Sequence, residues 1–524
     1  MQAEKEKSRA WGRGMRAFFP SALGKNIRYE VIGMEKRLFT AFALLLLSLG
    51  SLVARVAVVA VDPNYSDASA EQSTYTVKVA SMRGTIYDRF LRPLVNAERT
   101  SVEGANANLL SDYEVVSRIG EKPLAVHTIG TLDAQGKGAS GIEAAYDKLL
   151  SSCGGTLSVQ YTLDAKGKPL AGAQPKILDE NYDTGAGLAL TLDAEIQKIA
   201  QDASDSIERG AVVVMDPKTG DLLAVVSRPS FDPENMGPSL TDERAPFVNR
   251  AFSAYSVGST FKLLVSAAAI DAGISPQRTF DCTGEVEVGG LVFHCHQRNG
   301  HGMLDLAGAL EHSCNPYFIT LALQIGGESL RTAADSLGFG TAAELAPGYR
   351  TAAGALPSWE ELHSPAALAN FGFGQGTLTA TPVQLACLVS AIANGGGAVT
   401  PRLVCGTTAN GEDLFEKTAS YAVTPVFSKE SAALVRERMI GVVEEGSGRS
   451  AKPERGGAGG KTASAQTGQF LDGEEIVHAW FAGFYPAEEP AYTIVVFVEG
   501  GDSGSETACP VFREIADGLA KKAG

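Results

Sequence analysis

The sequence predicts an α+β protein with one membrane helix near its N-terminus, a small mixed region, and a larger domain built on an antiparallel sheet flanked by helices. Three observations lead to this prediction. The uncharged run Leu38–Ala54 has 17 residues, enough to enter a bilayer as a helix. Strand patterns at 210–226 and 479–498 enclose a series of helical patterns. With 524 residues and 44% hydrophobic side chains, the chain can bury a large core and form about two to four domains.

Charge is distributed unevenly along the chain. The 45 Lys and Arg face 60 Asp and Glu, a net charge of -15, which argues against a nucleic-acid-binding protein. Residues 1–37 nevertheless carry nine basic side chains against four Glu, a sum of +5, which leaves -20 for the rest. Because positive charge is retained on the cytoplasmic side, we expect this leader to be cytoplasmic and everything after the helix to lie outside.

The apolar run continues beyond Arg55 to Val61, so a helix over 38–61 would be about 36 Å long, with the arginine reaching toward the membrane surface. A cleaved signal peptide is the alternative. The small-residue site at 68–70 (Ala-Ser-Ala) lies well beyond the apolar run, and the leader is long for a signal, so we predict an uncleaved anchor. Met34 is an alternative start that would leave a very short cytoplasmic tail; the sequence leaves this open.

The organisation after the anchor follows from composition and periodicity. Residues 62–71 are polar and rich in turn formers, which is typical of a linker. From 74 to 185, short alternating stretches and turns indicate a modest α+β region without an obvious catalytic cluster. We therefore place the boundaries at 1–37 (leader), 38–61 (anchor), 62–185 (small domain) and 186–524 (large domain).

The large domain begins with two apolar strands at 210–226, joined by a turn at Asp216–Gly220. Because strands also close the domain, we expect both ends to meet in one antiparallel sheet. The predicted helices are Thr260–Ala272, Leu304–His312, Asn315–Ile325, Thr381–Asn394, Lys429–Val443 and Val511–Lys522, and the predicted closing strands are Ala479–Phe484 and Thr493–Val498.

The strongest chemical signal is Ser259, at the start of a predicted helix, with Lys262 three residues later in an apolar segment. The two side chains lie on one helical face about one turn apart, so the amine can reach the hydroxyl. Burial and a neighbouring cation lower the basicity of a lysine, which can then act as a neutral general base on the serine. Taken alone, this spacing is also that of a helix cap followed by a surface charge.

Two further elements complete the pattern. Ser313 and Asn315 lie between two predicted helices and can present a hydroxyl and an amide to one site, although both are also ordinary capping residues. Of three Lys-Thr pairs, the one at Lys218 lies in the hairpin turn and the one at Lys417 precedes a Thr-Pro break and a helix. Lys461 precedes the closing strands, so we predict that it lies on an edge strand and is the functional lysine.

The order Ser-x-x-Lys, Ser-x-Asn and a Lys-Thr-Gly-like motif resembles the penicillin-binding transpeptidases and serine β-lactamases. The likeness extends over about 80–520. Segments 83–89 (Arg-Gly-Thr-Ile-Tyr-Asp-Arg) and 141–147 resemble the pedestal domain of class B penicillin-binding proteins, of the division and sporulation type. Segments 374–384 and 478–486 resemble parts of their transpeptidase domain. The resemblance implies a pedestal at 62–185 and a β-lactamase-like transpeptidase domain at 186–524.

The resemblance implies a D,D-transpeptidase that cross-links peptidoglycan stem peptides through an acyl-enzyme and binds β-lactams covalently, with residual carboxypeptidase activity as an option. Ser259 would attack the penultimate D-Ala of a D-Ala-D-Ala donor, and Lys262 would take its proton. Ser313, held by Asn315, would pass a proton to the leaving amine, and Lys461 would supply positive potential. The residues implied at the site are Ser259, Lys262, Ser313, Asn315 and Lys461 for catalysis, and Thr462, Ala463 and Ser464 for substrate binding.

The implied partners are donor and acceptor stem peptides, β-lactams, the cytoplasmic membrane and a membrane glycosyltransferase. We predict no cofactor and assign no metal ligand. A β-lactamase is a competing interpretation, disfavoured by the pedestal-like region. A penicillin sensor or scaffold that has lost transfer is another, for which Ala463 in place of the family's Gly leaves room. We expect the extra methyl to tighten or tilt the peptide channel. Val257 replaces a Pro usual in relatives.

Seven cysteines are an odd number for an exported protein. Cys282 and Cys295 flank a predicted hairpin with its turn at 289–290, in a register that brings Cys295 nearer Gly284. His294, His296 and His301 lie close by in the sequence. The sequence is compatible with unpaired thiols, with a disulfide and with a zinc site.

Overall fold

A computed structural model describes residues 23–61, 73–419, 422–471 and 473–523. The chain forms two compact units, one comprising 1–77 with 159–177 and the other 78–158 with 178–524. The predicted linker at 62–71, the small-residue site at 68–70 and most of the basic leader lie outside the described residues.

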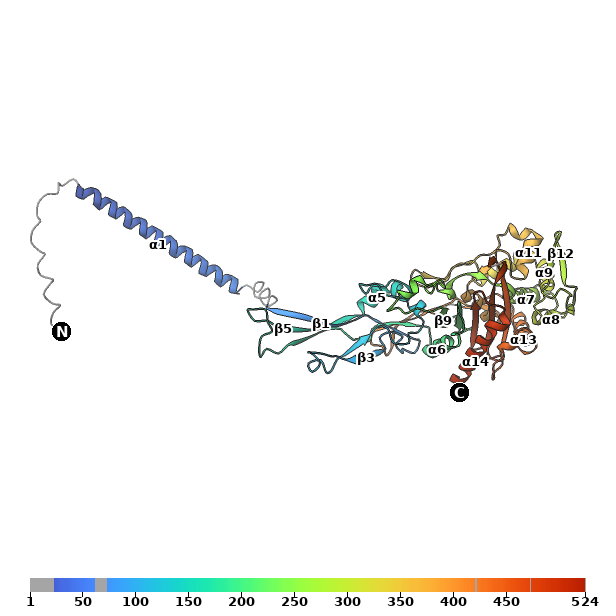
Figure 1. Cartoon of the computed structure of the whole chain (residues 1–524). Helices are drawn as coiled ribbons and strands as arrows, with labels where there is room; N and C mark the ends of the chain where they lie inside the picture. The colour runs from blue at the N-terminus through green and yellow to red at the C-terminus, as the bar shows by residue number, and fades with distance from the viewer. Residues whose placement is uncertain (1–22, 62–72, 420–421, 472, 524) are drawn as a thin grey trace, which may run out of the picture. The chain divides into compact units, whose positions relative to one another are not determined.

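The first unit contains one long helix, α1 (Leu23–Val61) (Figure 1). Its stretch Gly33–Val61 has 29 residues with a mean hydropathy of 2.4 in its most apolar window, and its large apolar side chains are exposed to the surroundings. At 1.5 Å per residue, this stretch is about 44 Å long, sufficient to span a bilayer. The helix begins at Leu23, before the expected start at Leu38, and its length and composition are those of a single-pass anchor.

The strands β1 (Thr74–Met82), β5 (Gly155–Thr162) and β6 (Lys176–Glu180) form a three-stranded sheet.

In the second unit, the two pedestal-like segments meet through ion pairs around Glu143. Arg83 Nε lies 2.9 Å from Glu143 Oε2, and Arg118 Nε lies 2.9 Å from Glu143 Oε1. The Glu143 side chain is only 2% exposed and its carboxylate pairs with both arginines, while Asp147 Oδ1, 2.9 Å from Arg83 Nη2, supplies a second negative charge.

The centre of the second unit is a five-stranded sheet in the order β22-β23-β24-β8-β9, every neighbouring pair antiparallel. The hairpin that the sequence predicts is β8 and β9, and β24 pairs directly with β8, so the two ends of the domain do meet in one sheet. The bounds are β8 Gly210–Met215, β9 Leu222–Arg228, β22 Gly459–Leu471, β23 Glu474–Tyr485 and β24 Tyr492–Val498.

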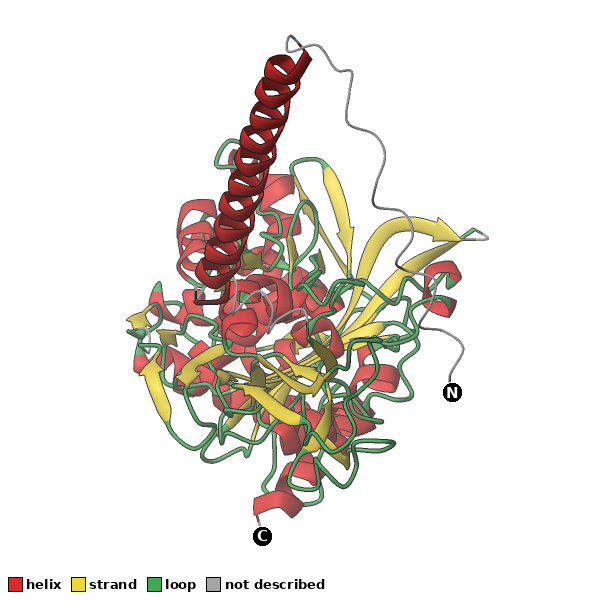
Figure 2. Cartoon of the chain, turned by 90° about the vertical axis from the view of Figure 1, so that its left-hand side faces the viewer, coloured by secondary structure: helices red, strands yellow, loops and turns green. Residues whose placement is uncertain are grey.

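Helices cover both faces of this sheet, because its strands are apolar on both sides. On β8, Val213 and Met215 belong to one core with α7 and α12, whereas Val212 and Val214 belong to another with α6 and α14. The unit is a mixture of helices and strands, the predicted α+β class (Figure 2). These helices are α6 Ala194–Ala203, α7 Lys262–Asp271, α12 Pro382–Ala393 and α14 Cys509–Ala523.

The remaining predicted helices are confirmed with shifts of a few residues. The predicted helix at Thr260 begins as a 3₁₀ turn, η3 (Gly258–Phe261), before α7. A second sheet, β2-β7-β19-β20, joins the pedestal-like segment to the large domain by parallel pairing of β2 with β7. Further bounds are β2 Thr85–Tyr87, β7 Gly187–Leu190, β19 Val404–Thr408, β20 Leu414–Lys417, α8 Leu306–Glu311, α9 Asn315–Ile325, α10 Gly327–Ser336, α11 Pro365–Gly372 and α13 Lys429–Glu444.

Candidate active site

Ser259 lies in the tight turn η3, which is held from two sides. Gly258 has a φ of 54°, and a Cβ added there would lie 3.0 Å from the Cβ of Ala465, so the turn packs directly on β22. On the other side, a Cβ added to Gly374 would lie 1.9 Å from the carbonyl oxygen of Gly258. Gly374 therefore packs on the serine turn, and backbone packing on both sides fixes the position of Ser259.

Lys262 is completely buried at the first position of α7. Its Nζ lies 2.8 Å from the Ser313 carbonyl oxygen, 3.2 Å from Ser313 Oγ and 2.7 Å from Asn315 Oδ1. The pKa of Lys262 lies well below its usual range, first because burial removes water from the ammonium and second because Lys461 is positively charged. The sequence motifs Ser-x-x-Lys and Ser-x-Asn thus meet at one amine.

The partners of Lys262 determine what a neutral amine would do here. A neutral lysine has two N–H groups and one lone pair, and both the Ser313 carbonyl and Asn315 Oδ1 can only accept hydrogen bonds. These two acceptors therefore engage both N–H groups. The lone pair is left for a hydroxyl group, and Ser313 Oγ lies 3.2 Å away. This arrangement suits a general base for a serine hydroxyl.

The loop that carries Ser313 is conformationally constrained. Ser313 has a φ of 52°, in the left-handed region that side chains other than glycine rarely adopt. Asn315 begins α9, followed by Pro316, and its Nδ2 donates to the carbonyl oxygen of His294 at 3.4 Å. Lys262 thus stabilises the strained loop, while the loop places a hydroxyl and an amide at the lysine.

Lys461 is fully buried on β22, and its Nζ donates to the carbonyl oxygen of Thr462 at 3.0 Å. Burial lowers the pKa of Lys461 to about 7, so its charge is only partly present at neutral pH. A carboxylate bound beside it would favour the ammonium form and restore that charge. The buried β22 position agrees with the expected edge strand of the closing sheet.

The three residues after Lys461 differ in exposure. Ser464 is exposed, whereas Ala463 is only 3% exposed and belongs to the core that contains the serine turn. Thr462 Oγ1 lies 2.7 Å from Ser447 Oγ. Ser447, in a short glycine-flanked loop after α13, is a site neighbour that sequence reasoning missed, since nothing in its spacing connects it to β22.

The other two Lys-Thr pairs lie apart from this site. Lys218 is an exposed residue of the β8–β9 turn, where its backbone N–H donates to Asp216 Oδ1 at 2.8 Å. Lys417 is the last residue of β20, in the second sheet. Both belong to ordinary surface structure.

A serine and a buried lysine one helical turn apart, packed against an antiparallel sheet, define the class of penicillin-recognising serine folds. A family model described as the penicillin binding protein transpeptidase domain matches residues 210–517. The chain belongs to this family, and the resemblance to class B penicillin-binding proteins is confirmed.

Two curated relatives show the extent of the likeness. The chain is 33% identical over 419 residues to stage V sporulation protein D of Bacillus subtilis, covering 74% of this chain and 61% of that protein. It is 29% identical over 412 residues to the peptidoglycan D,D-transpeptidase MrdA of Acinetobacter baumannii, covering 72% and 60%. The match therefore spans about 60% of the length of these relatives.

Solved structures share the fold. The D,D-transpeptidase domain of a peptidoglycan glycosyltransferase from Eggerthella lenta aligns with a TM-score of 0.67 and 26% identity, over 85% of this chain and 99% of that one. Penicillin-binding protein A from M. tuberculosis, solved as a penicillin G acyl-enzyme complex, also aligns with a TM-score of 0.67, over 84% and 99%. Its 23% identity supports the fold alone.

Proposed function

We propose that the protein is a membrane-anchored D,D-transpeptidase that cross-links peptidoglycan stem peptides through an acyl-enzyme on Ser259. The observation that carries this proposal is the buried Lys262, whose two pure acceptors leave its lone pair for a serine hydroxyl. A family relative is itself named a peptidoglycan D,D-transpeptidase. The exposed Ser464 on β22 and the Ser259 turn packed on that strand supply a surface where an extended peptide can pair.

In the proposed acylation, Ser259 Oγ attacks the carbonyl carbon of the penultimate D-Ala while Lys262 takes its proton. The amide C–N bond breaks, and the proton passes through Ser313 Oγ to the departing D-Ala amine. An amine of a neighbouring stem peptide then attacks the ester, loses a proton through the same groups, and frees Ser259. The same serine would open a β-lactam ring and remain acylated.

The substrate would be held by β22. The backbone N–H groups of Ser259 and Ser464 would stabilise the oxyanion, where one such donor is typically worth about 10²–10³ in rate. Lys461 would pair with the terminal carboxylate of the donor, with hydroxyls of Thr462 and Ser464 completing its contacts. Ala463, buried beside Gly258, would pack against the serine turn.

The remaining parts of the proposal concern location. We infer a cytoplasmic leader at 1–37, an anchor at 38–61, a pedestal at 62–185 and the transpeptidase domain at 186–524, with the catalytic domain outside the membrane. The asymmetric charge of the leader supports this orientation. A membrane glycosyltransferase that supplies the glycan strands is the partner we propose, with α1 as the contact.

The direct test is labelling of the full chain in detergent with a fluorescent penicillin. We expect labelling of the wild type, loss of labelling in Ser259→Ala, and full labelling in the control Ser336→Ala, which removes an exposed hydroxyl on α10. Persistent labelling of Ser259→Ala would remove this serine from the proposed role. Transpeptidation itself is tested with lipid-linked glycan, a glycosyltransferase and a supplied acceptor, followed by analysis of cross-linked peptides.

The competing interpretations give different results in the same experiments. Rapid release of hydrolysed penicillin instead of a lasting adduct would indicate a β-lactamase. Acylation without cross-linked product would indicate a sensor or scaffold. Release of D-Ala without an acceptor would show the carboxypeptidase activity.

A further inference from the structure

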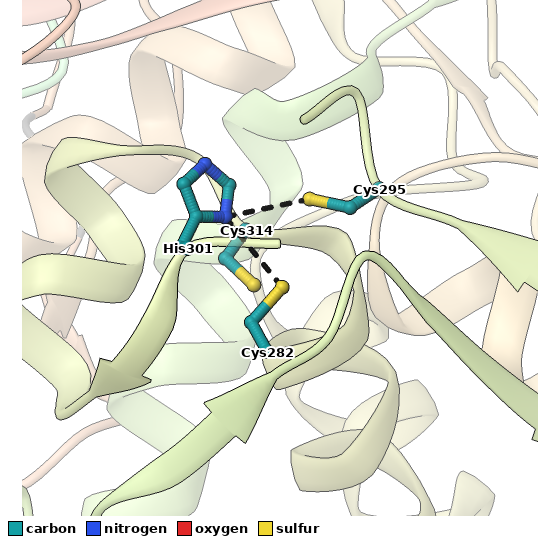
Figure 3. Close-up of side chains that lie close together, drawn as sticks. All are labelled: Cys282, Cys295, His301 and Cys314. Atoms are coloured by element: carbon teal, nitrogen blue, oxygen red, sulfur yellow. Dashed lines mark hydrogen bonds between the residues drawn. The ribbon is translucent and has the colours of Figure 1, made fainter. Parts of the chain in front are cut away.

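Three cysteines and a histidine converge beside the candidate active site (Figure 3). The ligand atoms of Cys282, Cys295, His301 and Cys314 all lie within 4.8 Å of one another. His301 Nδ1 lies 3.6 Å from Cys282 Sγ and 3.5 Å from Cys295 Sγ. The three cysteines are at most 1% exposed. Four side chains thus direct donor atoms to one small buried space.

The four residues come from two antiparallel strand pairs, one of which encloses the other in the sequence, and from the start of a helix. Cys282 ends β11 (Phe280–Cys282), which pairs with β14 (Gly302–Leu304) immediately after His301. Cys295 directly follows β13 (Leu291–His294), the second strand of the predicted hairpin, whose partner is β12 (Glu285–Val288). Cys314 immediately precedes α9.

The loops that carry these residues are packed backbone to backbone. A Cβ added to Gly300 would lie 2.0 Å from the carbonyl oxygen of Cys282, so only glycine permits this approach. The N–H of Cys295 donates to the carbonyl oxygen of Gly284 at 2.8 Å, the register that the sequence predicts. These backbone contacts therefore fix the positions of the loops that carry the cluster.

The spacing of the donor atoms matches a tetrahedral metal site. With Zn–S bonds of about 2.3 Å and Zn–N bonds of about 2.0–2.1 Å, a tetrahedron places sulfur and nitrogen about 3.6 Å apart. The two sulfur–nitrogen distances to His301 are 3.6 Å and 3.5 Å. Three thiols and one imidazole are a donor set that selects a borderline-soft ion such as Zn²⁺ over Mg²⁺ or Ca²⁺.

The structure shows which of the nearby histidines belongs to the cluster. His294 is turned to Glu285, with 3.3 Å between Nδ1 and the carboxylate oxygen Oε2. His296 Nδ1 lies 3.9 Å from Cys295 Sγ, beside the cluster and farther from that sulfur than His301. Of the three histidines near the predicted hairpin, His301 alone belongs to the group whose ligand atoms converge.

We propose that Cys282, Cys295, His301 and Cys314 bind one Zn²⁺ ion. On binding, each of the three thiols releases its proton to solvent and His301 binds as neutral imidazole through Nδ1. Three thiolates against the two charges of Zn²⁺ leave one net negative charge at the site. This proposal replaces the sequence-level expectation of no metal, and it gives the exported thiols a role other than a disulfide.

The second step of the inference rests on the proposed function. Cys314 lies between Ser313 and Asn315, and the neighbour of Cys295, His294, accepts the hydrogen bond from Asn315. A metal at this point would join the Ser313–Asn315 loop to the hairpin end that it contacts. The Zn²⁺ ion would act as a positioning element for the groups around Lys262, without touching the substrate.

The first experiment measures metal content alone. The full chain, purified in detergent without chelator, is analysed for zinc per polypeptide and for the tetrahedral thiolate spectrum of its Co²⁺-substituted form. We expect about one zinc in the wild type and at least about a tenfold loss of zinc affinity in Cys282→Ser, which changes a ligand on β11 and leaves the Ser313–Asn315 loop sequence intact. Cys405→Ser and His294→Gln are the matched controls, expected to keep the metal.

Wild-type protein gives a second measurement that does not depend on a variant's folding. Zinc released by a mercurial reagent should parallel the modification of three thiols, and these thiols should react slowly while metal is bound. The proposal is overturned if reduced protein takes up no Zn²⁺. It is equally overturned if protein isolated without reductant is 2 Da lighter, from a Cys282–Cys295 disulfide, and remains metal-free after reduction and addition of Zn²⁺.

The second experiment tests positioning through the rate of penicillin acylation. Chelator-stripped wild type is expected to acylate at least about tenfold more slowly and to recover with added Zn²⁺. An unchanged acylation rate in the stripped protein would overturn the positioning role of the metal. The existence of the zinc site would still be judged from the metal content alone. If no form of the protein is labelled, the proposed function fails, and the zinc measurement still stands, because it needs no penicillin.

Discussion

Replacing Lys262 by methionine tests the central chemical argument. Methionine has nearly the same length and fits the fully buried position, but it can neither accept nor donate a proton. Loss of a general base typically lowers the rate by about 10²–10⁴-fold, or about 2.7–5.4 kcal/mol in activation free energy. We expect penicillin acylation of Lys262→Met to fall within this range while Ser259 remains in place.

The effect on folding should be smaller than the effect on acylation. The Ser313 carbonyl and Asn315 Oδ1 would each lose a donor, at a cost of about 1–3 kcal/mol per buried acceptor. This loss is offset because methionine removes the need to bury an amine, whose desolvation is the largest cause of its lowered pKa. A small shift in unfolding temperature is therefore expected.

The assay is the second-order rate constant for acylation by a fluorescent penicillin, measured across pH. The wild-type rate should rise with pH as Lys262 loses its proton, and because its pKa is lowered, the rise should be complete below the pH at which an ordinary lysine, with pKa 10.5, titrates. Lys218→Met, in an exposed turn, is the matched control. Acylation of folded Lys262→Met at the wild-type rate would refute the reasoning.

Three further predictions concern neighbouring features. In Lys461→Met, loss of a positive charge should raise the pKa of Lys262 and move the acylation profile to higher pH; an unmoved profile would contradict the electrostatic coupling. Glu143→Gln should leave Arg118 without its carboxylate partner and Arg83 with Asp147 alone, and cost about 3–5 kcal/mol because the Glu143 side chain is only 2% exposed; lost hydrogen-exchange protection around the pedestal-like segments measures this, and unchanged protection would contradict it. Gly374→Ala, with φ 86° and a Cβ 1.9 Å from the Gly258 carbonyl, should displace the serine turn and lower penicillin labelling, whereas wild-type labelling would show that the contact is dispensable.

Local patterns accounted for much of the fold. The hairpin β8–β9 and helices such as α9 and α13 followed from apolar periodicity and capping, which are properties of neighbouring residues. The antiparallel union of the domain's two ends followed from the placement of strands around helices. Helix α10 (Gly327–Ser336) was not predicted. Its sequence is mostly polar and only Leu330 and Ala334 are buried, so it lacks a clear apolar periodicity.

Chemistry was harder to predict where the partners are distant in the chain. The sequence located Ser259 and Lys262 because helical geometry fixes residues three apart, and it chose Lys461 over Lys218 from the strands that follow. It could not show that Lys262 meets Ser313 and Asn315 through 2.8 Å and 2.7 Å contacts, since more than fifty residues separate them. Nor could spacing place Ser447 beside Thr462.

What the sequence by itself determined was the α+β class, the long apolar helix near the N-terminus and a candidate set of reactive side chains, because composition, periodicity and one-turn spacing are local. What only the tertiary structure decided was the environment of those side chains: the buried amine with its two pure acceptors, and the convergence of four metal-type ligands from three strand ends and a helix start. The physical reason is that desolvation and donor spacing arise from contacts between distant segments, which no local pattern contains.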